Sequence, residues 1–339
     1  MFDSVNPEFR AKKGLPKSVD EYVEGILSGN RTLLSQAITL IESSRDDHRE
    51  ISEEILERCL SKTGKSVRIG ISGVPGVGKS TFIDALGRKL ITEGKRIAVL
   101  TIDPSSSRSK GSILGDKTRM QYLSTDPGAY IRPSPTSGTL GGVAKKTRES
   151  MLLCEAAGYE IIFIETVGVG QSETAVYSMV DFFLVLMLSG AGDELQGIKR
   201  GILEMADLIA INKADGDNVE ASKRAKQEYQ NALSLFPAQP SGWKPLVKMC
   251  SSLNGSGLDD IWTEVNKYLE FTSGNGYFDK HRKEQAVDWM YESVQYRLQE
   301  TFYKHPEIKK QLKTIENKVS EGTLSSFKAA SELITLYSR

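Results

Sequence analysis

A run of residues in the first third of the chain has the types and spacing of a phosphate-binding loop. It matches the pattern G-x-x-x-x-G-K-[ST] in full, between a β-rich run and a helical run. Glycines let backbone N–H groups turn toward phosphate oxygens, and the helix adds its positive N-terminal end. We expect the lysine to neutralise the β- and γ-phosphates, the serine to ligate Mg²⁺ and the following threonine to face the α-phosphate. An ordinary Gly-rich turn is the alternative, which the flanking strand and helix disfavour. The residues are Gly73, Val74, Pro75, Gly76, Val77, Gly78, Lys79, Ser80 and Thr81.

Acidic residues at the ends of apolar runs suggest the rest of a magnesium site. Glu165 follows such a run, and Gly168 stands three residues later, where its N–H would reach the γ-phosphate. Glutamate is one methylene longer than the usual aspartate, which favours a contact through water; a solvated strand-end acid is the alternative. Asp103 and Asp116 lie in polar loops at the expected ligand-binding edge of the sheet. Each is a candidate for the magnesium shell or the attacking water, and a solvated loop charge fits each equally well.

The tetrad Asn212-Lys213-Ala214-Asp215 follows another apolar run and has the pattern N-K-x-D. A carboxylate accepts from N1–H and N2–H of guanine at once, whereas adenine offers no such pair of donors. Asp215 therefore predicts guanine, with the Lys213 stem over the base and Asn212 connecting loops. A later segment fits a final base loop whose backbone N–H meets guanine O6, although a plain strand-to-turn junction fits as well. Its residues are Ser251, Ser252 and Leu253.

Apolar runs that alternate with helical stretches must position these motifs. The expected strands are residues 67–72, 96–102, 161–164, 182–188 and 208–211. Because such alternation builds parallel sheets, we predict an α/β P-loop NTPase fold with a mostly parallel central sheet flanked by helices. Both ends of the chain have helical patterns. We therefore predict three parts: an N-terminal helical segment (1–65), a nucleotide-binding domain (66–272) and a C-terminal helical part (273–339).

Both ends of the chain carry further helix signals. Ser18 and Glu21 have the spacing of a capping box. Two short helices are expected after Pro306 and after Gly322. Before them, one helical face collects apolar residues that either pack within the monomer or join two copies of the chain. These residues are Val287, Met290, Tyr291, Val294, Leu298 and Phe302.

The composition excludes several classes of function. Lysine plus arginine equals aspartate plus glutamate, 44 against 44, which argues against a broad basic surface for nucleic acid. The three cysteines are widely spaced without a C-x-x-C pair, as expected for inert thiols in a reducing compartment. No apolar run reaches membrane-spanning length, and residues 1–17 lack a secretory pattern. We expect a soluble cytoplasmic protein, or one of the mitochondrial matrix if the source is eukaryotic, with neither a nucleic-acid nor a membrane partner.

Together these residues resemble the methylmalonyl-CoA mutase-associated GTPase family, MeaB/ArgK, whose human relative is the methylmalonic aciduria type A protein. The resemblance runs from about residue 15 to the C-terminus. It is carried by the strings GVPGVGKST, DPSS, LGDKTRM, YIRPSPTSGTLGGV, ETVGVGQSE, GDELQGIKRGI and NKADGD.

The resemblance implies a homodimeric SIMIBI-class GTPase that loads or protects an adenosylcobalamin-dependent acyl-CoA mutase. The loops of Asp103 and Asp116 look like switch I, and residues 165–173 look like switch II. The C-terminal helices look like a dimerisation arm. A third switch, which responds to the mutase, looks like the segment containing Asp193, Gln196 and Lys199. From the residues alone, that segment is a polar helical stretch.

No Gln follows Gly168 directly and no arginine finger is evident, so we predict slow GTP turnover that a partner accelerates. Lys199 or Arg200 would supply the positive charge once the partner orders the third switch. The rival functions are a metallochaperone GTPase, a kinase or ATPase serving amino-acid transport, and a targeting GTPase of the signal-recognition type. The scattered histidines disfavour a metallochaperone, and the guanine-type Asp215 disfavours a kinase or ATPase. The methionines are not clustered, which disfavours a targeting GTPase.

Overall fold

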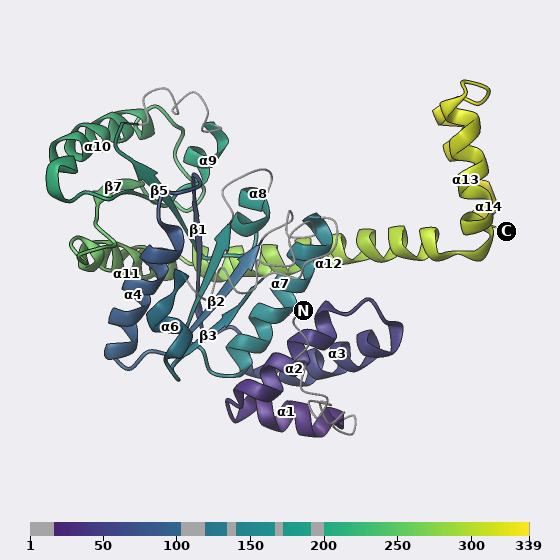
Figure 1. Cartoon of the computed structure of the whole chain (residues 1–339), viewed down its shortest axis with the longest axis horizontal. Helices are drawn as coiled ribbons and strands as arrows, with labels where there is room; N and C mark the ends of the chain where they lie inside the picture. The colour runs from purple at the N-terminus through teal and green to yellow at the C-terminus, as the bar shows by residue number, and fades with distance from the viewer. Residues whose placement is uncertain (1–16, 103–118, 134–139, 167–171, 191–199, 339) are drawn as a thin grey trace, which may run out of the picture. The chain divides into compact units, whose positions relative to one another are not determined.

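The computed structural model describes residues 17–102, 119–133, 140–166, 172–190 and 200–338. Within these ranges seven strands form one sheet in the order β3-β2-β4-β1-β5-β6-β7, and all neighbouring strands are parallel (Figure 1). The predicted parallel α/β sheet is therefore confirmed. The strands are β1 (Val67–Gly73), β2 (Ile97–Ile102), β3 (Ala129–Arg132), β4 (Ile161–Thr166), β5 (Phe182–Leu188), β6 (Leu208–Asn212) and β7 (Leu246–Met249).

The two edge strands are the ones that the sequence pattern does not reveal. β3 and β7 have four residues each and pair on one side only. The inner strands β2 and β4 are buried along their whole length, which requires the continuous apolar runs that the sequence displays. Runs as short as β3 and β7 contain too few apolar residues to stand out from a loop.

Helices cover both faces of the sheet (Figure 1). Ile69 and Ile71 of β1 belong to a core that includes residues of α4 and α11. Gly70, between them, faces the other side, where a Cβ atom would lie 2.8 Å from Val176 of α8. Because successive residues of a strand face opposite sides, these helices lie on opposite faces. The helices of this part are α4 (Lys79–Thr92), α6 (Gln121–Thr125), α7 (Leu140–Ala156), α8 (Ser172–Tyr177), α9 (Arg200–Met205), η3 (Gly216–Asn218), α10 (Val219–Leu233) and α11 (Leu258–Gly274).

The described part of the N-terminal segment is helical, as predicted. The capping box is present, because Ser18 Oγ accepts from the Glu21 N–H at 3.2 Å and Glu21 Oε2 accepts from the Ser18 N–H at 2.8 Å. Leu34 and Ile38 are fully buried, and the helices pack on one another and on α7. The elements are α1 (Val19–Leu27), α2 (Arg31–Glu42), α3 (Asp46–Cys59) and η1 (Leu60–Lys62).

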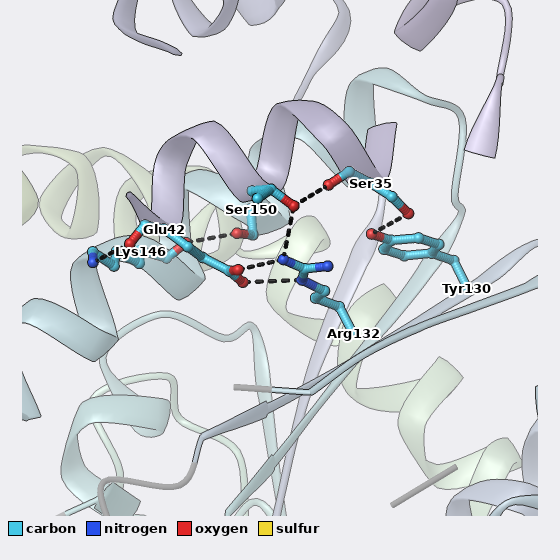
Figure 2. Close-up of polar contacts among 7 residues, drawn as sticks. Ser35, Glu42, Tyr130, Arg132, Lys146 and Ser150 are labelled. Atoms are coloured by element: carbon cyan, nitrogen blue, oxygen red, sulfur yellow. Dashed lines mark hydrogen bonds and ion pairs between the residues drawn. The ribbon is translucent and has the colours of Figure 1, made fainter. Parts of the chain in front are cut away.

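A polar cluster joins α2 to the edge of the sheet and to α7. Figure 2 shows Arg132, at the end of β3, facing Glu42, at the end of α2. The pair is bidentate, with Arg132 Nε donating to Glu42 Oε1 at 3.0 Å and the second nitrogen donating to Oε2. Lys146 Nζ donates to the Glu42 main-chain oxygen at 2.6 Å, and Ser35 Oγ donates to the Tyr130 hydroxyl at 3.2 Å. Bidentate pairing fixes orientation as well as distance, so these contacts set the register of α2 against the sheet.

The contacts divide the chain into two compact units, Met1–Gly274 and Asn275–Arg339. In the second unit α13 contacts α14, and Ile308, Ile315 and Ala329 are buried. The boundaries predicted at 65 and 272 remain predictions. No described helix is long and apolar enough to cross a bilayer. The helices of the second unit are α12 (Tyr277–Lys304), α13 (Pro306–Ser320) and α14 (Ser326–Tyr337).

The apolar face expected before Pro306 lies on α12, and much of it is exposed. α13 begins at Pro306 and α14 follows Gly322, as predicted. Large apolar side chains on a helix normally face a core. On α12 these side chains are either covered by a partner surface or remain in contact with solvent. The exposed members are Val287 at 51%, Met290 at 53%, Tyr291 at 60%, Val294 at 48% and Leu298 at 59%.

Candidate nucleotide-binding site

The predicted phosphate loop connects β1 to α4, and its three glycines all have backbone conformations that other residues rarely adopt; Gly76 has φ 79°. Gly73 has φ 149° and Gly78 has φ 97°. A Cβ atom at Gly73 would lie 2.4 Å from the Leu186 main-chain oxygen, and one at Gly78 would lie 2.9 Å from Asn212 Nδ2. Both separations are too short for a real Cβ, so glycine is required by the turn and by its neighbours.

Lys79 and Ser80 occupy the first turn of α4 and are buried. Lys79 Nζ donates to the main-chain oxygens of Gly73 at 2.8 Å and Val74 at 3.3 Å, so the ammonium lies inside the curve of the loop. Burial lowers the pKa of Lys79, and the negative charges of Glu165 and Glu173 oppose that shift. A desolvated ammonium at a helix N-terminus favours an anion beside it.

Glu165 lies next to the phosphate loop because β4 pairs with β1. Ile71 is opposite Glu165 in the register, and Ser80 Oγ donates to Glu165 Oε1 at 2.8 Å. A buried hydroxyl and a buried carboxylate at this distance are oxygen donors of the kind that Mg²⁺ prefers, so the donor chemistry fits the predicted magnesium site. Of the other predicted site residues, Asp103, Asp116, Gly168 and Lys199 lie outside the described residues, as do Asp193 and Gln196.

A cavity of about 490 Å³ opens over these residues. Three of its lining residues, Thr101, Arg119 and Thr166, have no individual role in the sequence predictions. Thr101 and Thr166 stand at the carboxyl ends of β2 and β4, the edge where α/β sheets bind ligands, and that position was the available signal. The lining comprises Pro75, Gly76, Gly78, Lys79, Ser80, Thr81, Thr101, Arg119, Glu165 and Thr166.

Asn212, the first residue of the guanine-type tetrad, bridges the phosphate loop and the last base loop. Its Nδ2 donates to the Val77 main-chain oxygen at 2.8 Å. Its Oδ1 accepts from Ser252 N at 3.1 Å and from Ser252 Oγ at 2.9 Å. Asn212 is 1% exposed, so these hydrogen bonds are shielded from water. Lys213, with a positive φ of 58°, donates from Nζ to the Gly76 main-chain oxygen at 2.8 Å.

The remaining base residues gather at the ends of β6 and β7. Asp215 accepts a hydrogen bond from Ser251 Oγ. The Ala214 N–H donates to the Cys250 main-chain oxygen at 2.9 Å, which holds the two loops side by side. Ser251 and Ser252 therefore lie at the tetrad, whereas the side chain of Leu253 is 86% exposed and packs little. The structure thus brings together the phosphate loop, Glu165, the tetrad and residues 251–252.

Comparisons with known proteins identify the family to which the chain belongs. The family model described as methylmalonyl-CoA mutase-associated GTPase MeaB matches residues 34–307. A probable GTPase of Mycobacterium tuberculosis is 47% identical over 319 residues, covering 94% of this chain and 95% of that protein. The mitochondrial methylmalonic aciduria type A homolog of Mus musculus is 46% identical over 329 residues, covering 94% of this chain and 79% of that protein. A crystal structure named LAO/AO transport system kinase superposes with a TM-score of 0.73 at 34% identity, covering 96% of this chain and 100% of that one.

Proposed function

Since this chain belongs to the methylmalonyl-CoA mutase-associated GTPase family and is a P-loop GTPase, we propose that it serves an adenosylcobalamin-dependent methylmalonyl-CoA mutase as a chaperone. It would couple GTP binding and hydrolysis to the loading and protection of the mutase cofactor. The observation that carries the nucleotide part is the Asn212 bridge, because it joins a phosphate loop and a guanine-type tetrad in one buried network. The mutase part is supported by the family match.

The residues of the cavity divide the work of phosphate binding. The N–H groups of the phosphate loop and Lys79 hold the β- and γ-phosphates in place, and Ser80 and Glu165 would hold Mg²⁺, which supplies positive charge to the phosphates. Water attacks the γ-phosphorus, the bond to the bridging oxygen breaks, and GDP and phosphate leave. Positioning and charge stabilisation supply most of the catalysis of such a reaction. Asp103, Asp116 and Gly168 are proposed to complete the magnesium shell, the water site and the γ-phosphate contact.

Recognition of the base is proposed to depend on Asp215. Its carboxylate, which accepts a hydrogen bond from Ser251 Oγ, would also accept hydrogen bonds from N1–H and N2–H of guanine. An adenine in the same position would leave the carboxylate without these donors, and unpaired buried polar groups give large discrimination. The backbone of residues 251–253 would meet guanine O6, and Lys213 would cover one face of the base.

The regulated form of the reaction is proposed to need the mutase and a second copy of the chain. We propose slow turnover in isolation and acceleration when the mutase orders the segment containing Lys199, with Arg200 as the alternative source of positive charge. The exposed apolar residues of α12 support a homodimer in which this face is covered. The setting proposed is the cytoplasm of a bacterium, or the mitochondrial matrix, as the name of the mouse relative suggests.

The decisive experiment measures GTP turnover of the full chain with and without methylmalonyl-CoA mutase from the same source, after the two proteins are tested for co-purification. We expect a stable complex and a turnover rate that rises with mutase concentration. The Lys79→Ala variant, which should lose magnesium-dependent nucleotide affinity, is the control for contaminating GTPases. Rapid turnover in isolation that the mutase leaves unchanged would contradict the proposal.

A further inference from the structure

Arg119 is a cation of the phosphate cavity to which the reaction described above gives no task. It lines the cavity together with Lys79, Ser80 and Glu165. Its side chain is exposed, and it lies close enough to Lys79 for the two positive charges to interact unfavourably. Two cations that repel each other across a cavity are both stabilised when a polyanion lies between them.

The backbone beside Arg119 is fixed to the helix that carries Lys79 and Ser80. Met120, the next residue, is fully buried. The carboxylate of Asp84, one turn after Ser80 in α4, accepts from the main-chain N–H groups of Tyr122 at 3.3 Å and Leu123 at 2.9 Å. These bonds satisfy the N–H groups of the second and third residues of α6 and hold its start against α4.

Packing strengthens the same connection between α4 and α6. Gly87 of α4 leaves room for Leu123, whose Cδ1 would lie 2.8 Å from a Cβ atom at position 87. Arg88 of α4 stacks over the ring of Tyr122, with the guanidinium carbon 4.9 Å from the ring centroid. The exposed guanidinium of Arg119 therefore extends from a rigid support into a cavity that already contains the phosphate-binding lysine.

We propose that Arg119 is a catalytic residue of GTP hydrolysis, supplied by the same chain, whose guanidinium contacts the γ-phosphate. Negative charge shifts toward the bridging oxygen as its bond to the γ-phosphorus breaks and water adds, and the fixed guanidinium stabilises that charge while staying protonated. The water proton leaves with the phosphate. The proposal rests on the proposed assignment of this cavity to the GTP phosphates.

The test compares single-turnover GTP hydrolysis by the wild-type chain and by Arg119→Ala, Arg119→Lys and Arg88→Ala. We expect Arg119→Ala to lower the rate by on the order of 20-fold, the ratio between GTPases with and without an arginine in the same chain. Arg119→Lys should recover part of the rate, because it keeps the charge and loses the planar fork. Arg88→Ala removes only the stacking contact with Tyr122, and it should lower the rate much less than Arg119→Ala does, because the Asp84 hydrogen bonds still hold the start of α6.

Affinities for GDP and for GDP with aluminium fluoride separate a catalytic from a structural role. Arg119→Ala should bind GDP as tightly as the wild type and lose affinity for the aluminium fluoride complex, which imitates the transferring phosphoryl group. Three results would each overturn the proposal. They are an Arg119→Ala rate equal to that of the wild type, a loss of GDP affinity in Arg119→Ala as large as its loss for the aluminium fluoride complex, and a loss of rate in Arg88→Ala as large as that in Arg119→Ala. Failure of the wild-type chain itself to bind GDP would instead refute the assignment of the cavity.

Discussion

Replacing Asn212 by alanine tests whether the phosphate loop and the base loop depend on one side chain. Asn212 Nδ2 bonds to the Val77 oxygen on one side, and Asn212 Oδ1 bonds to the N–H and hydroxyl of Ser252 on the other. Alanine removes all three contacts and adds no bulk. Cys250 Sγ, which also approaches Asn212 Oδ1 at 3.6 Å, is too weak a donor to matter greatly.

The expected cost follows from what the substitution leaves behind. The Val77 carbonyl and the Ser252 N–H would remain in a buried site without the partner they have now, whereas the Ser252 hydroxyl can rotate. Each unsatisfied buried group costs roughly 1–3 kcal/mol, so Asn212→Ala should lower the free energy of unfolding by roughly 2–6 kcal/mol. Loss of the Val77 hydrogen bond should also weaken GDP binding by about tenfold, the equivalent of about 1.4 kcal/mol.

Urea unfolding without nucleotide and calorimetric titration with GDP measure the two effects separately. Lys213→Ala is the matched control, because its bond to the Gly76 oxygen is exposed and its loss should change stability little while lowering base affinity. An Asn212→Ala variant that unfolds at the same urea concentration as the wild type, with an unchanged slope, would refute the reasoning. So would a stability loss in Lys213→Ala of the same size.

Three further predictions follow from other parts of the chain. Burial raises the pKa of Asp207 from 3.8 to about 8, so the folded state binds a proton more tightly than the unfolded chain and stability falls as the pH rises from 4 toward 8. Asp207→Asn keeps an acceptor for the Phe183 N–H but cannot ionise. The difference in free energy of unfolding between this variant and the wild type should therefore shift in favour of the variant by roughly 2–4 kcal/mol between pH 5 and pH 8, at 1.36 kcal/mol per pKa unit. Parallel pH profiles of the two proteins in urea would contradict this prediction. Asp215→Asn should weaken GTP by at least about a hundredfold in competition titrations and leave weak ATP binding unchanged. Leu298→Glu should convert a dimer to a monomer in sedimentation experiments without a change in GDP affinity; a wild-type monomer would refute the dimer.

The sequence predicts the inner part of the fold well because the same physical constraint acts on every residue there. The strands that begin at Ile161 and Phe182 are buried on both faces, so their apolar character is continuous and visible without any partner. The phosphate loop is equally legible, since Gly73 and Gly78 are required by backbone geometry in their own segment. In both cases the constraint is local, and local constraints leave a pattern in the chain.

Contacts between distant segments leave no such pattern. The Arg132–Glu42 pair joins residues 90 positions apart. From the sequence alone, each of these two side chains would be predicted to be a solvated surface charge. Arg119, which lines the cavity, stands just before the start of α6, and Asp84 holds that start through contacts made across 38 and 39 positions. The strands β3 and β7 are recognisable only from their pairing. What is missing from the sequence prediction is therefore mainly the set of residues whose role depends on the order of the strands.

That strand order explains why loops scattered over the chain can act as one site. The phosphate loop follows β1, Glu165 lies near the end of β4, and the tetrad begins at the end of β6; the sheet order places β4 next to β1, and only β5 separates β1 from β6. All are parallel, so their carboxyl ends meet at one edge. The segment that contains Lys199 follows β5, the strand between β1 and β6. The carboxyl end of β5 therefore lies between the ends of the strands that lead into the phosphate-binding and guanine-binding loops, next to both parts of the nucleotide site.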